Sequence, residues 1–184
     1  MRITKLTFML IALVGLASLA GYFGGGTSRA AVMDDKVNAQ WKGMESFSLT
    51  NAGPNVARCG AFPENIELSF AGSGIDTEGG VFDVVASACT NTNTNQIFDL
   101  KATDTYVQGG DQVFIEGDPF VQIINPANCV ATNSHAVMGR VTGGTGSRTG
   151  ATGHARFHFA NNLTPCNGQN APAHVWFEGV FMRP

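Results

Sequence analysis

Residues 141–159 read VTGGTGSRTGATGHARFHF, a glycine-rich run that leads directly into alternating polar and apolar residues. A phosphate-binding P-loop needs a lysine after its glycines, and this run contains none. A dinucleotide-binding turn leads into a helix, whereas HARFHF alternates as a strand does and only 34 residues remain after Gly150. The run is therefore predicted to turn the chain between two strands and not to bind a nucleotide.

The same alternation recurs along most of the chain. In ENIELSF, the apolar residues Ile66, Leu68 and Phe70 share one face, as in a half-buried strand. Segments of this kind are separated by turn-forming clusters such as SGID (73–76), NTNTN (91–95) and NPAN (125–128). This pattern predicts an all-β fold, either an antiparallel barrel or a β-sandwich. The other candidate strands are WKGMESFSL (41–49), VFDVVASA (81–88), QIFDLKA (96–102), QVFIEG (112–117), FVQII (120–124), AVMGRV (136–141), HARFHF (154–159) and HVWFEGVF (174–181).

The first residues form a secretory signal pattern, in which basic MRITK precedes an 18-residue apolar run over residues 6–23. Small residues allow cleavage after Ala20 or after Ala30. An uncleaved anchor stays open, because 18 apolar residues are at the lower limit of a membrane span. We assign residues 1–31 to a signal peptide and leader and residues 32–184 to one β domain. The protein is expected to be secreted, periplasmic or extracellular, without a stable membrane span once the signal is cleaved.

The domain that remains after residue 31 is acidic. It carries eight basic and 14 acidic residues, a formal charge of −6. An acidic surface without clustered Lys or Arg repels phosphate backbones, so nucleic acid is not an expected partner.

Four cysteines in an exported chain predict two disulfides. Three pairings are possible. Pairing Cys59 with Cys89 and Cys129 with Cys166 centres each loop on a glycine-rich turn, near residue 74 and near residue 148, so we predict the sequential pairing. No Cys-x-x-Cys motif is present, and no metal site is expected.

Two C-terminal strands carry the polar residues of most interest. On HARFHF, the side chains of His154, Arg156 and His158 share one face, opposite the apolar face of Phe157 and Phe159. The polar face is interpreted either as a constellation at a cavity mouth, with Arg156 holding a carboxylate, or as an ordinary solvated face.

On HVWFEGVF, Phe177 and Phe181 belong to the predicted core face, whereas Trp176 lies on the polar face. An exposed indole is typical of a contact with a partner, here a second copy of the chain. Packing of Trp176 under a loop or under the N-terminal strand is the alternative.

No catalytic residue is predicted. There is no Gly-x-Ser-x-Gly elbow, and the cysteines are expected to be oxidised. The acids Asp99, Asp104, Asp111 and Asp118 are interpreted as residues in or beside turns. No cofactor is expected either.

The glycine run resembles the GGTGRFxGATGxxxF signature of small secreted barrels similar to allene oxide cyclase and plant dirigent proteins. LSFAGSGIDTEGGVFDVVASAC (68–89) also looks like the paired strands of this group, and the resemblance covers most of residues 59–159. Arg148 stands where the pattern usually has an aromatic residue, which weakens the packing analogy there. The resemblance implies an eight-stranded antiparallel barrel with an apolar cavity and frequent oligomerisation. No catalytic residue of the plant cyclases has a matching motif here.

The function that we expect is binding of a small apolar ligand inside the barrel. The candidate lining residues are Phe157, Phe159, Phe177 and Phe181, with His154, Arg156 and His158 as polar contacts. A homo-oligomer is an expected assembly. Two alternatives are a cyclase-like or isomerase-like enzyme that steers the conformation of its substrate, and a dirigent-like, non-catalytic oligomeric scaffold. A buried Glu or His facing the cavity would favour the enzyme.

Overall fold

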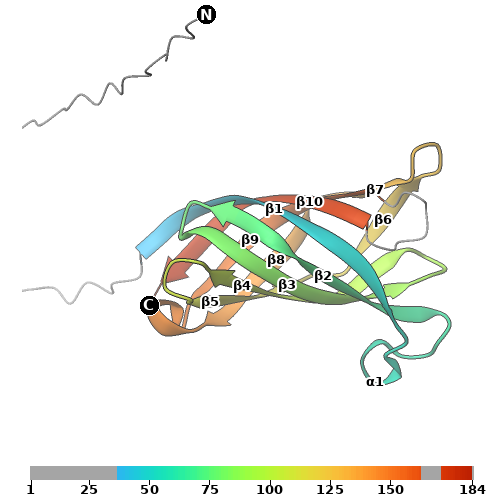
Figure 1. The fold of residues 1–184 in the computed structure, drawn as a ribbon, viewed down its shortest axis with the longest axis horizontal. Helices are drawn as coiled ribbons and strands as arrows, with labels where there is room; N and C mark the ends of the chain where they lie inside the picture. The colour runs from blue at the N-terminus through green and yellow to red at the C-terminus, as the bar shows by residue number, and fades with distance from the viewer. Residues whose placement is uncertain (1–36, 163–170, 184) are drawn as a thin grey trace, which may run out of the picture. The chain divides into compact units, whose positions relative to one another are not determined.

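Long antiparallel strands dominate the computed structural model, which describes residues 37–162 and 171–183 (Figure 1). These residues belong to one compact unit, Asp34–Pro184. The predicted signal peptide and leader lie outside the described residues. No helix in the described part is long and apolar enough to cross a membrane. The elements are β1 (Val37–Gly53), α1 (Val56–Cys59), β2 (Asn65–Asp76), β3 (Gly80–Asn91), β4 (Gln96–Tyr106), β5 (Gln112–Gly117), β6 (Phe120–Asn125), β7 (Val130–Asn133), β8 (Val137–Gly144), η1 (Gly146–Arg148), β9 (Thr152–Asn162) and β10 (Ala171–Arg183).

The strands close into an antiparallel eight-stranded barrel. Strands β1 to β5 and β8 to β10 pair in chain order, and β10 returns to pair with β1. Strands β6 and β7 pair with each other, and they pair with β4 and β9 respectively, so they extend the same wall beyond β5 and β8. Asp118 and Pro119 interrupt the wall between β5 and β6, and proline lacks the N–H that a strand ladder needs. The barrel prediction is confirmed, and the β-sandwich alternative is wrong.

All nine candidate strands lie in or overlap observed strands, because alternation along each strand separates the core face from the solvent face. On β9, Ala155, Phe157 and Phe159 are buried, whereas His154 and Arg156 are exposed. The aromatic rings of the core are packed against one another. The indole of Trp41 lies 4.6 Å from the ring of Phe177, measured between centroids. Burying a large apolar side chain contributes about 1.5–3 kcal/mol, so these rings supply much of the barrel's stability.

Several glycines lie inside the wall because aromatic rings occupy the space of their missing side chains. A Cβ on Gly74 would lie 2.4 Å from Cζ of Phe82, and one on Gly43 would lie 2.3 Å from Cζ of Phe177. The prediction that SGID (73–76) is a turn is therefore wrong: these residues end β2, and the turn is formed by residues 77–79. Glycine is present at residue 74 because the ring of Phe82 packs against it, and not because the chain turns there.

The glycine-rich run of residues 141–159 connects two antiparallel strands, as predicted. It comprises the end of β8, the short helix η1 and the first part of β9, and β8 pairs with β9. Gly146 has a φ of 56°, and a Cβ there would lie 1.8 Å from Oδ1 of Asp111. The Asp111 carboxylate accepts hydrogen bonds from the backbone N–H and the hydroxyl of Ser147. The glycines thus allow a tight turn that an acid from a neighbouring loop holds.

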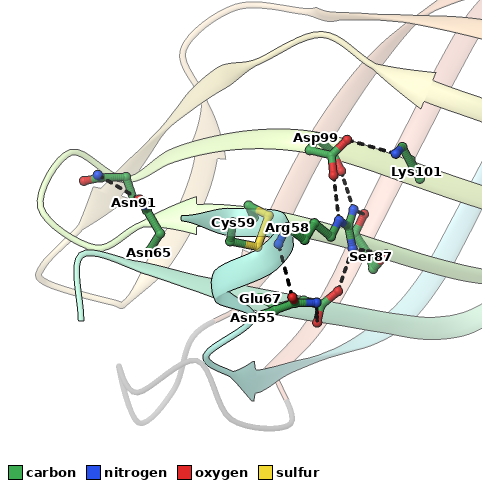
Figure 2. Close-up of a disulfide and its surroundings, with 10 residues drawn as sticks. Asn55, Arg58, Cys59, Asn65, Glu67, Ser87, Asn91, Asp99 and Lys101 are labelled. Atoms are coloured by element: carbon green, nitrogen blue, oxygen red, sulfur yellow. Dashed lines mark hydrogen bonds and ion pairs between the residues drawn. A yellow bond between two sulfur atoms is a disulfide. The ribbon is translucent and has the colours of Figure 1, made fainter. Parts of the chain in front are cut away.

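A disulfide fastens the single turn of α1 to the outside of the β2–β3 hairpin (Figure 2). Cys59 on α1 is bonded to Cys89 on β3, with Cα atoms 5.4 Å apart, which confirms this predicted pair. Cys166 lies outside the described residues, so the Cys129–Cys166 pair stays a prediction. The helical turn α1 and the short strand β7 were not predicted, because four residues are too few to show a period.

Arg58 adds polar contacts between α1 and the strands β2, β3 and β4. Its guanidinium donates hydrogen bonds to the carboxylates of Glu67, at 2.6 Å, and Asp99, at 2.6 Å, and to the hydroxyl of Ser87, at 2.6 Å (Figure 2). The backbone carbonyls of Ser87 and Asp99 accept two more. We refer to α1, the disulfide and these partners of Arg58 as the outer clasp.

Candidate functional site

Besides Asn161 of β9, five polar side chains lie buried in the described part of the barrel: Glu45 of β1, Asp76 of β2, Asp104 and Tyr106 of β4, and Arg148 of η1. The strand register places Glu45 and Tyr106 in one cross-strand row, because Glu45 lies opposite Gly74, Gly74 opposite Phe82, and Phe82 opposite Tyr106. Asp76 and Arg148 both contact Tyr106, and Asp104 is two residues before it on β4. We refer to these five residues as the inner cluster.

Asp76 is the fully hydrogen-bonded member of the inner cluster. Its Oδ2 accepts a hydrogen bond from the indole N–H of Trp41, at 2.9 Å, and one from the hydroxyl of Tyr106. Its Oδ1 accepts two from the backbone N–H groups of Glu78 and Gly79, at 2.9 and 2.8 Å. Four donors on two oxygens match the accepting capacity of an ionised carboxylate. Burial and the bond to Asp76 in turn raise the pKa of Tyr106.

Arg148, which stands where the family pattern usually has an aromatic residue, forms cation–π contacts with two aromatic rings. Its guanidinium carbon lies 3.8 Å from the ring centroid of Tyr106 and 5.4 Å from that of Phe181. Its Nη2 donates to the backbone carbonyl of Glu78, at 3.2 Å, whereas Nη1 has no partner among the described residues. Arg148 departs from the aromatic residue of the family pattern, yet the position still packs on rings, since the planar guanidinium stacks on them.

Asp104 is the most isolated acid of the inner cluster. Its side chain is 0% exposed, and neither carboxylate oxygen has a hydrogen-bond partner in the described part of the chain. Burial, with the nearby charges of Glu45 and Asp76, raises the pKa of Asp104 well above its ordinary value, and Arg148 offsets this only in part. The interpretation of Asp99 and Asp104 as residues in or beside turns is wrong, because both lie within β4.

Glu45 connects the inner cluster to a cavity in the barrel. Burial, together with the charge of Asp76, raises the pKa of Glu45 from 4.5 to about 7. Its side chain lines an apolar cavity of about 40 Å³. Near neutral pH a large share of this carboxyl is protonated, so it can donate a hydrogen bond or a proton to a molecule in the cavity. The other lining residues are Phe47, Phe70, Val84, Ala86, Leu100, Ala102, Ile115, Gly117, Phe157, Phe159 and Val175.

The ligand-binding residues proposed from the sequence lie partly in the barrel core and partly on its outer face. Phe157 and Phe159 line the cavity, while Phe177 and Phe181 are buried around Trp41. The side chains of His154, Arg156 and His158 lie on the outer face of the barrel, because they alternate with buried residues. Trp176 is also on the outer face, 47% exposed, and its indole stacks on His158 with ring centroids 5.3 Å apart.

The acids of the inner cluster were missed, although the sequence carries a signal for them. In WKGMESFSL, Glu45 has the same parity as Trp41, Phe47 and Leu49, so it belongs to the core face. In the same way, Asp104 has the same parity as Tyr106, which is buried. Glu45 and Asp104 could therefore have been identified from the sequence as acids on the core face of an alternating strand. Within residues 37–162 and 171–183, no group of three or more His, Cys, Asp or Glu side chains is placed to hold a metal ion.

Comparison with known proteins gives a match in fold. No family model and no curated protein matches the sequence. Among solved structures, the pterocarpan synthase dirigent protein GePTS1 matches with a TM-score of 0.51 at 11% sequence identity, covering 89% of this chain and 99% of that chain. Identity this low is evidence for the fold and not for the activity. The likeness to allene oxide cyclase stays a prediction from the sequence motif. The chain therefore has the dirigent-like β-barrel fold.

Proposed function

We propose that the barrel binds a small, mainly apolar molecule whose hydroxyl or carbonyl group forms a hydrogen bond with Glu45. The supporting observation is the lining of the cavity, in which Glu45 is the one ionisable residue among the described lining residues and the other eleven are apolar or glycine. Such a lining matches the general character of small-molecule sites, which combine an apolar wall with few polar groups that fix orientation. A protonated carboxyl can donate to a carbonyl and accept from a hydroxyl.

The size of the cavity limits the ligand. Its volume of about 40 Å³ has room for a few water molecules, whereas sites for drug-sized ligands span about 300–1,000 Å³. A ligand with a ring therefore needs lining side chains to change rotamer. Phe159 is a large side chain that lines the cavity, so its removal is the direct way to make room, although its present position is held by stacking on Phe120, with ring centroids 5.1 Å apart.

The second candidate is an acid–base enzyme of the cyclase or isomerase type. It is supported by Glu45 and Asp104, whose raised pKa values keep them able to donate a proton at neutral pH. Incubation of the protein with an extract of its own host tests this role. A product that forms with the wild type and not with Glu45→Gln supports catalysis, and equal product with both variants contradicts it.

The third candidate is an exported, non-catalytic oligomeric scaffold, as the fold of a dirigent protein suggests. The disulfide Cys59–Cys89 is compatible with export. For self-association, the support is a continuous apolar row on the outer face, formed across neighbouring strands by Trp176, Met44, Ile75, Val81 and Val107. These side chains are 47–65% exposed, and contiguous apolar patches of this kind mark protein contacts. Light scattering after size exclusion tests this candidate, and a strict monomer contradicts it.

Ligand binding is tested with phenol and toluene, which have similar shape and differ in one hydroxyl. We expect the wild type to bind phenol more tightly than toluene, and Glu45→Leu to lose this preference, because the carboxyl is then absent. Phe159→Ala enlarges the cavity and is expected to tighten binding of both probes. NMR shifts of methyl groups that line the cavity, such as those of Val84 and Val175, measure binding. If neither probe shifts these signals in the wild type or in Phe159→Ala, the proposal fails.

A further inference from the structure

A groove of about 370 Å³ lies on the outer face of the barrel, away from the interior cavity. It crosses β1, β10, β9 and β8, which are neighbours in the wall. The strand register places its side chains in cross-strand rows, in which Glu178 lies opposite both Lys42 and Arg156, and Arg156 lies opposite Met138. The residues that line it are Gln40, Lys42, Met138, His154, Arg156, Glu178, Gly179 and Val180.

The groove contains two positively charged side chains that form no ion pair with the described residues. Lys42 and Arg156 are exposed, and neither takes part in an ion pair among the described residues. Glu178 lies between them and supplies one negative charge, which leaves one positive charge unbalanced. The domain as a whole carries −6 after residue 31, so this local excess is opposite in sign to the net charge of the domain. The outer Arg58, Lys101 and Arg140, in contrast, are paired with acids.

We propose that this groove binds a small organic monocarboxylate, with its carboxylate bound mainly by the guanidinium of Arg156 and with Lys42, on the other side of Glu178, adding a second positive charge. The guanidinium offers a planar pair of donors that fits a carboxylate. Met138 and Val180 provide apolar surface for the body of the ligand, and Gln40 and His154 provide further hydrogen-bonding groups. One unbalanced charge matches one carboxylate, whereas a polyanion is repelled by the acidic domain. This site is independent of the ligand proposed for the barrel interior.

Benzoate and the neutral benzamide are the probes that test the proposal. The protein has two tryptophans, so the two indole N–H signals in a ¹H–¹⁵N spectrum separate the two locations. Trp176 lies on the outer face of β10, two residues from Glu178, whereas Trp41 is buried and bonded to Asp76. We expect benzoate to shift the Trp176 signal and the backbone amides of β9 and β10, and benzamide to shift them much less. Equal shifts with benzamide, or shifts confined to Trp41, overturn the proposal.

Three variants test the charges directly. Arg156→Gln is expected to weaken benzoate binding about two- to fivefold, which is the range for an exposed ion pair. Glu178→Gln is expected to strengthen it by a similar factor, because it removes the repelling charge. Lys101→Gln, on β4 outside the groove, is the matched control and should leave the Kd unchanged. A Kd that does not move in opposite directions for Arg156→Gln and Glu178→Gln overturns the proposal, provided that circular dichroism shows both variants folded.

Discussion

The outer clasp combines one arginine with the two acids Glu67 and Asp99, whereas the inner cluster combines one arginine with three acids, of which Glu45 and Asp104 have pKa values shifted in the opposite direction. In the outer clasp, Arg58 donates to both Glu67 and Asp99. Hydrogen bonds from Asn55 and Arg58 lower the pKa of Glu67, and the bond from Arg58 lowers the pKa of Asp99.

In the inner cluster, Arg148 stacks on Tyr106 and donates to a backbone carbonyl, so Asp104 receives no hydrogen bond from it. Burial then raises the pKa values of Glu45 and Asp104. The comparison shows that an arginine nearby does not decide the charge state of an acid. What decides it is the balance between desolvation and the hydrogen bonds that the acid accepts.

Removing the disulfide of the outer clasp is expected to have the largest effect. The bond closes a loop with a sequence separation of 30 residues. On the chain-entropy account, opening a loop of this length lowers the free energy of unfolding by about 3–4 kcal/mol. Urea unfolding of the double variant Cys59→Ala, Cys89→Ala measures this loss. Arg58→Met with the disulfide intact is the control and should cost less. If Arg58→Met costs as much as the double variant, the polar contacts and not the disulfide hold the clasp.

Glu45, the acid of the inner cluster that lines the cavity, is expected to lower the free energy of unfolding as pH rises. Because the folded pKa of Glu45 is about 7 and its ordinary value is 4.5, the folded state binds more protons than the unfolded state between these values. The stabilisation is complete below about pH 4.5 and is lost as pH rises through about 7, a change of about 3 kcal/mol.

Glu45→Gln should remove most of this pH dependence and leave the variant more stable than the wild type at pH 8. Thermal unfolding between pH 4.5 and 8 measures it, with the exposed Glu64→Gln as the matched control. Asp104→Asn should act in the same direction, because the pKa of Asp104 is also raised. Parallel pH curves for the wild type and Glu45→Gln would contradict the assignment of a buried, protonated carboxyl.

The acids of the outer clasp should show a small effect of the opposite sign. The lowered pKa of Glu67 means that its ionised form stabilises the fold above its ordinary pKa and that this contribution is lost as pH falls. Glu67→Gln should therefore be less stable than the wild type at pH 7, by about 0.5–1 kcal/mol, as is typical of partly exposed ion pairs. The difference should shrink at pH 3. Urea unfolding at both pH values measures it, and a variant that is more stable at pH 7 would refute the role of the Arg58 pair.

The strands were predictable because alternation is a local property. ENIELSF shows its core face within seven residues, and the run of residues 141–159 shows its turn through its glycines and the strand that follows. Predictions from neighbouring residues in the sequence were wrong where a residue type is explained by a contact with another strand. Gly74 was read as part of a turn, but its space is occupied by the ring of Phe82, which comes from β3.

The site was less predictable than the fold. Parity placed Phe157, Phe159, Phe177 and Phe181 on the core face, where all four are buried, but only Phe157 and Phe159 line the cavity. Asp104 was assigned to a turn from its residue type, although it is buried in β4. Arg148 was noted only as a departure from the family pattern, and nothing in the sequence indicated that Tyr106, 42 residues earlier in the chain, provides a ring on which it stacks.

By itself, the amino-acid sequence determined the antiparallel β-strands and the turn at residues 141–159, and it predicted the pairing of Cys59 with Cys89 that the structure confirms. The strand pattern left both a barrel and a sandwich open, and the structure decided for the barrel. Only the tertiary structure decided which acids are charged and which polar residues face the cavity. The physical reason is that alternation depends on neighbours in the chain, whereas desolvation and hydrogen bonding depend on neighbours in space. Glu45 and Glu67 are the same residue type on adjacent strands, and the groups packed around each one shift their pKa values in opposite directions.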